Sequence, residues 1–378
     1  MTMNNKEPFI RIVKNNNITT KSKIVMRLII FGIAILVSMI FIAIVSKKNP
    51  LPAFGYIFSG SFGNASKFSG FLKEAIILLG ISIALVPAYK MKFWNVGAQG
   101  QILMGALMSA IMMVYLNNLP NWLLLIITLF AALIGGGLWG FIPGFFKAKF
   151  HTNETLFTLM MNYIAIQLVS FTTENWRGQK SSLGIINFST EKGWLPTIGN
   201  SMARDVIIPL IIIGLLVGIV YLYMTKTKQG YEITVIGESK NTAKYIGIKY
   251  KMVIIRTLII SGALCGLIGF FYVSGFDHTI SSMTSGSYGF TAIIVAWLGH
   301  FNPLFMIIYA FLIVFLNKGA INLKNVAYSP NLNEYSCEFI VLVIIIAIML
   351  TEFFANYKFV FNFKRKEQKV TDELKEIK

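Results

Sequence analysis

The chain has 378 residues, of which 55% are hydrophobic and only 13% are charged, yet its formal net charge is +18. A soluble domain carries about a quarter charged residues, so this composition excludes an ordinary soluble fold, a disordered basic tail and a nucleic-acid-binding domain. With 2 cysteines, a disulfide scaffold and a multi-cysteine metal cluster are excluded as well. The composition predicts an all-α, polytopic membrane helical bundle.

A helix needs about 20 apolar residues to cross the hydrocarbon of a membrane. Apolar runs that approach or reach this length occupy residues 28–46, 75–89, 96–116, 122–146, 155–173, 206–224, 252–275 and 338–355. The first run has no cleavage site after it, so we expect a retained anchor and not a signal peptide. The uncharged stretch 288–316 is interrupted at 299–303, and it forms either two short helices or one overlong helix.

The basic residues favour one topology, because cytoplasmic loops of membrane proteins carry excess Lys and Arg. With the N-terminus inside and ten spans, 24 of the 34 basic residues are cytoplasmic. Nine spans would put the basic tail outside, whereas ten, or eight plus a re-entrant pair, keep it inside. We therefore expect about ten transmembrane helices within 28–355. They lie between a cytoplasmic N-terminus (1–27) and a cytoplasmic tail (356–378), with an external loop at 174–204 and a cytoplasmic loop at 225–251.

The chain lacks the motifs of an energy-transducing or hydrolytic enzyme. There is no P-loop and no H-E-x-x-H, and the three histidines fall in separate loops, so we predict no catalytic residue and no metal site. Four carboxylates are expected at the ends of spans: Glu74, Glu154, Asp205 and Glu338. The absence of a carboxylate near the membrane centre counts against an ion-coupled transporter.

Glycines recur at every fourth position in two of the predicted spans. Gly136, Gly140 and Gly144 lie in one of them, and Gly262 and Gly266 lie in another. Small residues at this spacing allow helix backbones to approach closely within lipid. We therefore interpret these glycines as contacts within the bundle.

The first informative segment, 93–106, is rich in glycine and leads directly into an apolar span. It carries the amides Asn95, Gln99 and Gln101, which are costly in lipid unless they meet a partner or water. Two interpretations stay open. The segment either begins a central helix that faces a polar path, or it is an interfacial helix entry capped by Asn95.

The second segment, 237–248, lies in the long basic loop at 225–251. Ala243, Ile246 and Gly247 fall on one face of a short helix, which would bury this small apolar face against a protein partner. The alternative is an amphipathic loop whose lysines contact anionic lipid headgroups.

The third segment, 285–303, repeats the pattern of a glycine-rich entry followed by an apolar helix. It suggests duplicated halves, with spans 2–5 matching spans 7–10.

These segments, together with residues 151–165, resemble the permease family of ATP-binding-cassette importers for branched-chain amino acids, simple sugars and nucleosides. The resemblance rests on four ordered matches, N-V-G-A-Q-G-Q at 95–101, N-E-T-L at 153–156 with M-N-Y-I-A at 161–165, G-E-S-K-N-T-A-K-Y-I-G-I at 237–248, and G-F-T-A-I with L-G and N-P at 289–303. It covers residues of about 28–355. The sequence departs from the family pattern at Gln99, Trp297 and His300, and the segment before span 2 and the external loop look most like the nucleoside branch.

The resemblance implies a permease subunit of an importer in the bacterial plasma membrane. This subunit would bind no nucleic acid and would hold no cofactor of its own. Its implied partners are cytoplasmic ATP-binding subunits, a second permease subunit, an extracytoplasmic substrate-binding lipoprotein or periplasmic protein, and membrane lipid. The implied ATPase-coupling residues are Gly237, Glu238, Asn241, Ala243, Lys244, Ile246 and Gly247. The expected path residues are Asn95, Gln99, Asn162, Gln167 and Trp297. A neutral solute such as a nucleoside suits this lining. The alternatives are a sugar or branched-chain amino acid permease, or a stand-alone secondary transporter.

Overall fold

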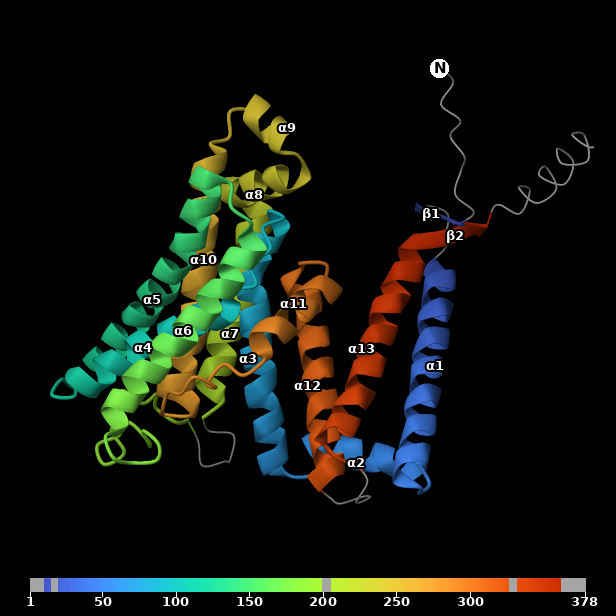
Figure 1. The fold of residues 1–378 in the computed structure, drawn as a ribbon, viewed down its shortest axis with the longest axis horizontal. Coiled ribbons are helices and arrows are strands. Elements are labelled where there is room, and N and C mark those ends of the chain that lie inside the picture. Colours follow the sequence, from blue (N-terminus) through green and yellow to red (C-terminus); the bar gives the residue numbers. More distant parts are fainter. Residues whose placement is uncertain (1–9, 15–19, 199–204, 326–331, 362–378) are drawn as a thin grey trace, which may run out of the picture. The chain divides into compact units, whose positions relative to one another are not determined.

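The computed structural model describes residues 10–14, 20–198, 205–325 and 332–361. These residues form helices and one two-stranded sheet (Figure 1). The chain divides into two compact units, one made of residues 1–54 and 323–378 and the other of residues 55–322. Parts of the expected cytoplasmic N-terminus (1–9 and 15–19), the end of the external loop (199–204) and most of the expected tail (362–378) lie outside the described residues.

The first unit contains two long helices and the sheet. Helix α1 (Thr20–Ser46) packs against α13 (Glu334–Asn356), with the rings of Phe41 and Phe339 4.5 Å apart between centroids. Strands β1 (Ile10–Lys14) and β2 (Tyr357–Phe361) pair antiparallel. The sequence analysis did not predict this sheet, although both strands are rich in the β-branched and aromatic residues that favour β-structure.

The second unit is built from a continuous series of helices. They are α2 (Leu51–Phe62), α3 (Ala65–Lys90), α4 (Ala98–Tyr115), α5 (Asn121–Phe150), α6 (Glu154–Arg177), α7 (Ile207–Lys226), α8 (Lys228–Glu238), α9 (Lys240–Tyr245), α10 (Tyr250–Phe270), the π-helical segment η1 (Phe271–Phe276), α11 (Tyr288–Leu298) and α12 (Pro303–Asn325). Of the candidate spans, α3 is the most deeply buried and α6 the least.

Helices α4, α5 and α10 form the centre of the second unit, and glycines set how closely they pack. A Cβ atom on Gly136 would lie 2.3 Å from the carbonyl oxygen of Gly262. A Cβ atom on Gly266 would lie 2.1 Å from the carbonyl oxygen of Ala132. No side chain fits at these distances, so the glycine pattern brings backbone against backbone. The interpretation of these glycines as bundle contacts is confirmed.

The described helices support a polytopic membrane protein with seven or eight spans by length and composition. Seven helices are long and apolar enough to cross, or eight if α1 and α2 form one broken span. Helix α11 and the segment Tyr335–Thr351 of α13 are shorter. With 11 residues, α11 rises about 16 Å and covers about half of the hydrocarbon thickness. The count of about ten spans and the duplication stay predictions.

The stretch 288–316 forms two helices and not a single overlong one. The break lies between Leu298 and Pro303, and Pro303 is the first residue of α12, where a missing N–H is tolerated. Helix α12 extends to Asn325, beyond the apolar stretch. The sequence analysis left open two short helices or one overlong helix, and the structure has two helices. Of these, α11 is short with 11 residues, whereas α12 has 23 residues.

Helix α3 begins earlier than the hydropathy predicts, and this changes the position of one carboxylate. The predicted span begins at residue 75, but the helix begins at Ala65, with the side chain of Asn64 capping it. Glu74 therefore lies inside α3, nine residues after its start, and its place at the end of the membrane-crossing part of this helix stays a prediction. Its carboxylate pairs with the ammonium of Lys318 on α12 at 2.5 Å.

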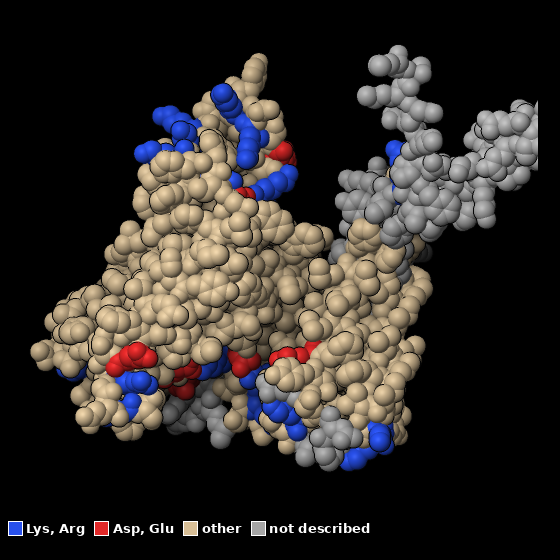
Figure 2. Space-filling model, viewed as in Figure 1, with Lys and Arg blue, Asp and Glu red and all other residues tan. Residues whose placement is uncertain are grey.

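Charged side chains gather at two opposite ends of the second unit, with an uncharged surface between them (Figure 2). One end holds α8 and α9 and is mainly basic, while the other end carries both signs of charge (Figures 1 and 2). This distribution is that of a helical bundle crossing a membrane, with polar groups kept outside the hydrocarbon. The basic α8–α9 end agrees with the loop expected to be cytoplasmic.

The segment between α6 and α7 folds back onto the ends of α4 and η1. The amide of Leu195 donates to the carbonyl of Ser274 at 2.7 Å, and the indole of Trp194 stacks on His278 with centroids 3.9 Å apart. Burial lowers the pKa of His278, and the nearby carboxylates of Asp205 and Asp277 oppose this shift. The described part of this segment therefore covers the ends of α4 and η1.

Candidate functional site

Helices α8 and α9 form a compact hairpin at the basic end of the second unit (Figure 1). The hydroxyl of Thr227 caps α8 by accepting from the amide of Gly230 at 3.1 Å. The hydroxyl of Ser239 caps α9 by accepting from the amide of Thr242 at 3.2 Å. Gly247 follows with a φ of +80°, a left-handed conformation that suits glycine and turns the chain toward α10.

Two glycines let α8 lie directly against the ends of neighbouring helices. A Cβ atom on Gly230 would lie 2.3 Å from the carbonyl oxygen of Tyr223, and one on Gly237 would lie 2.0 Å from that of Lys90. An ion pair between Glu232 and Arg256, 3.0 Å long, further ties α8 to α10. Because α8 touches the ends of α3, α7 and α10, displacement of α8 would act directly on these membrane helices.

Helix α9 is anchored on one side and exposed on the other. Ala243 is fully buried, whereas Tyr245 is 92% exposed and Ile246 is 48% exposed. Of the seven expected coupling residues, Gly237 and Ala243 are buried and the others are exposed: Glu238, Asn241, Lys244, Ile246 and Gly247. The hairpin therefore presents an aromatic and an aliphatic side chain from a rigid base. Such a surface is suited to docking against another protein.

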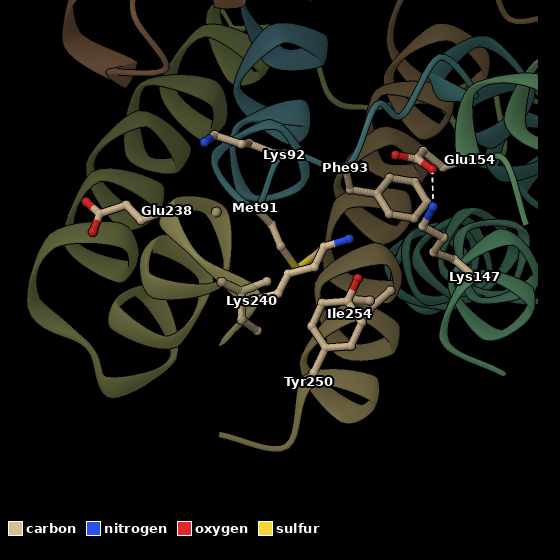
Figure 3. A pocket seen from close by; sticks show the side chains of 11 residues that line it. Met91, Lys92, Phe93, Lys147, Glu154, Glu238, Lys240, Tyr250 and Ile254 are labelled. Atoms are coloured by element: carbon tan, nitrogen blue, oxygen red, sulfur yellow. Dashed lines mark hydrogen bonds and ion pairs between the residues drawn. The ribbon is translucent and has the colours of Figure 1, made fainter. Parts of the chain in front are cut away.

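A cavity of about 210 Å³ lies between this hairpin and the body of the second unit (Figure 3). The side chains of Phe93, Lys240 and Tyr250 converge there, and the Lys240 ammonium lies 5.5 Å from the centre of the Tyr250 ring. At one side Lys147 pairs with Glu154. The lining is formed by Met91, Lys92, Phe93, Lys147, Glu154, Ile236, Gly237, Glu238, Lys240, Tyr250 and Ile254. This cavity leaves space for the hairpin to shift against α3 and α10.

A buried network of amides supports the irregular backbone that leads into α4. The side-chain amide of Asn95 donates to Gln101 at 3.2 Å and to Ser261 at 3.4 Å. Its oxygen accepts from the backbone amide of Gly97 at 3.0 Å. These contacts replace the water that such polar groups would otherwise need in a bundle.

Asn162 on α6 extends the same support from the neighbouring helix. Its side-chain oxygen accepts from the amide of Gly100 at 2.8 Å, and its nitrogen donates to the carbonyl of Val96 at 2.9 Å. The hydroxyl of Thr158 also accepts from the amide of Val96, at 3.2 Å. Asn162 thus satisfies backbone groups that would otherwise be unpaired at the start of α4.

The five expected path residues are not brought together at one place by these contacts. Asn95 and Asn162 are buried and hydrogen-bonded within the protein. Gln99 is half-buried, Gln167 is exposed on α6, and Trp297 is 51% exposed on α11. The sequence analysis omitted Thr158 and Ser261 from the network, since a lone hydroxyl in an apolar run gives no spacing signal. The assignment of the five residues to a path stays a prediction.

The fold is that of a helical membrane protein with a helical hairpin anchored at its basic end. Residues 68–349 match the family described as the branched-chain amino acid transport system / permease component, and the chain belongs to this family. It is the permease component of an ATP-binding-cassette transporter and is not itself an enzyme. Permeases of this class work with ATPase and substrate-binding partners.

Three curated relatives cover most of the chain. The nucleoside ABC transporter permease protein NupB of Lactococcus lactis is 27% identical, over 84% of this chain and 88% of its own length. The glucose ABC transporter permease protein TsgB13 of Haloferax volcanii is 27% identical, over 84% and 85%. The guanosine ABC transporter permease protein NupP of Bacillus subtilis is 28% identical, over 75% and 81%. No solved structure gives a significant match.

Proposed function

We propose that this chain forms part of the translocation path of an importer for nucleosides, driven by partner ATPases that dock on the α8–α9 hairpin. The observation that carries the proposal is the hairpin itself, with Tyr245 and Ile246 exposed on a base held by Gly237 and the Glu232–Arg256 pair. A docked ATPase could move α8 against the ends of α3 and α10. The chain would thereby receive the energy of ATP hydrolysis without an ATP site of its own.

The proposed topology follows from the same hairpin. With α8 and α9 in the cytoplasm, both termini of the chain are cytoplasmic as well. This topology requires ten crossings of the membrane, one of which is made by α11 together with the segment before it. The mainly basic surface of this end agrees with the positive-inside rule (Figure 2). The duplicated halves, the bacterial plasma membrane location, the second permease and the external binding protein belong to the same proposal.

The proposed substrate is a nucleoside because the names of two relatives refer to nucleoside and guanosine transport. The glucose permease relative is as similar, so a simple sugar is the second candidate. Uptake of labelled guanosine, glucose and leucine by cells that express the complete transporter decides among the solute classes. Guanosine uptake supports the proposal, and uptake of glucose or leucine alone contradicts the nucleoside assignment.

Two substitutions test the docking hairpin. Ala243→Arg forces a charge into a fully buried position, and Gly247→Trp adds a large ring where the structure leaves open space. Both should abolish uptake and copurification of the ATPase while membrane insertion persists. Gly184→Trp is the matched control, since Gly184, in the segment between α6 and α7, also has a positive φ (+74°) and faces open space. Survival of uptake in both hairpin variants would show that the ATPase does not dock there.

A further inference from the structure

Glu74 interacts with three polar side chains from other elements of the second unit. We call these four residues the α3–α12 polar cluster: Glu74, Tyr272, Tyr288 and Lys318. The carboxylate of Glu74 pairs with the ammonium of Lys318 at 2.5 Å, and it also interacts with the hydroxyl of Tyr288. Tyr272 interacts electrostatically with both Glu74 and Tyr288. Ser285 lies three residues before Tyr288 in the chain.

One hydroxyl of this cluster, that of Tyr272, and the hydroxyl of the nearby Ser285 are buried without a hydrogen-bond partner among the described residues. Tyr272 is 4% exposed and Ser285 is fully buried, and neither hydroxyl is hydrogen-bonded. Native proteins rarely leave such groups unpaired, because each lost partner is costly. Tyr272 also belongs to the π-helical segment η1, and π-helical turns within α-helices occur frequently at functional sites.

The cluster is accessible on one side and adjoins the start of α4 on the other. The side chains of Glu74 and Lys318 are 26% and 23% exposed, so the ion pair is partly open at the surface. Gly289 follows Tyr288, and a Cβ atom there would lie 3.1 Å from the amide nitrogen of Gln99. The backbone next to Tyr288 thus lies directly against the backbone of the half-buried Gln99.

We propose that the α3–α12 polar cluster binds the transported solute through adjacent hydroxyl groups of its sugar ring. This inference rests on the proposed function and names the residues that would recognise the solute. A carboxylate can accept hydrogen bonds from ring hydroxyls, as acidic residues do with the ribose of nucleotide cofactors. The charges of Glu74 and Lys318 cancel, which suits a neutral solute. The shared chemistry is a vicinal diol, supplied by either a nucleoside or a free sugar.

Tyr272→Phe gives the cleanest test, because it removes only a hydroxyl that has no hydrogen-bond partner within the described part of the chain. A structural role predicts unchanged or improved stability and unchanged uptake. Solute binding predicts a rise of about fivefold in the KM of uptake, with maximal rate and stability unchanged. Thr257→Val is the matched control, since it removes another buried, unpartnered hydroxyl from α10, and its KM should equal the wild-type value.

Glu74→Gln and the charge-balanced double variant Glu74→Gln/Lys318→Met test the diol contact in the complete transporter. The probes are labelled guanosine, 2′,3′-dideoxyguanosine and ribose. Loss of the preference for guanosine over the dideoxy analogue supports a nucleoside diol, and a raised KM for ribose alone supports a free sugar. If Tyr272→Phe and Glu74→Gln keep wild-type KM values while the ATPase still copurifies, the proposal that the cluster binds the solute is wrong, but the proposed function stands. A wild-type chain that brings down no ATPase overturns the proposed function.

Discussion

Substitution of Asn162 by Leu should destabilise the protein by removing the support that α6 gives to the start of α4. The change keeps the side chain close in size but leaves the amide of Gly100 and the carbonyl of Val96 without their partner. A buried polar group left unpaired costs about 1–3 kcal/mol, so two groups cost about 2–6 kcal/mol. Hydrogen bonds between membrane helices measure lower, since the unfolded chain in lipid also finds partners. We therefore expect a loss of about 2–3 kcal/mol.

The assay is reversible unfolding of the purified protein in mixed micelles, followed by circular dichroism. Gln167→Leu is the matched control on the same helix, because Gln167 is exposed and its loss should change stability by less than about 0.5 kcal/mol. An Asn162→Leu variant that is as stable as the wild type but no longer transports would refute the reasoning. Asn162 would then be a path residue and not a support for α4.

Two further predictions concern helix packing and the cover formed between α6 and α7. Gly266→Val should prevent accumulation of folded protein, because its side chain would overlap the carbonyl of Ala132, whereas Gly214→Val, which faces open space, should accumulate as the wild type does; equal yields of folded protein on size-exclusion chromatography would contradict this. Burial lowers the pKa of His278, so the unfolded chain takes up a proton at a higher pH than the folded chain. Stability should be complete above about pH 6.5 and should fall below it. Thermal melts at several pH values, followed by Trp194 fluorescence, should show this fall in the wild type and less of it in His278→Gln, and equal pH dependence would contradict it.

Much of the bundle is predictable from the sequence because lipid imposes strong and local rules. Long apolar runs predicted the central helices, and the four-residue glycine spacing identified residues of α5 and α10 that make close helix contacts. The short helix α2 was missed because 12 residues with glycine and serine carry no clear apolar period. The start of α3 at Ala65 was missed for a related reason. A polar residue lowers the hydropathy of a window even when a long-range partner such as Lys318 compensates its charge within the helix.

The functional regions were predictable to different degrees. The segment 237–248 is identifiable because its caps, its buried Ala243 and its turn at Gly247 are all local features. The role of Asn162 depends on the backbone of another helix, which no spacing along the chain reveals. The α3–α12 polar cluster joins residues more than 200 positions apart, so only the tertiary structure brings it to notice.

The central claim is that an ATPase docks on the α8–α9 hairpin, and one crosslinking measurement tests it directly. Both cysteines of the chain, Cys265 and Cys337, are buried, so Tyr245→Cys places a single accessible thiol at a position that is 92% exposed in the wild type. A short bifunctional reagent should join this thiol to the ATPase subunit in the assembled transporter. Ser182→Cys, in the segment between α6 and α7, should give no such product. Absence of the crosslink at position 245, or its appearance at position 182, would contradict the proposed docking site.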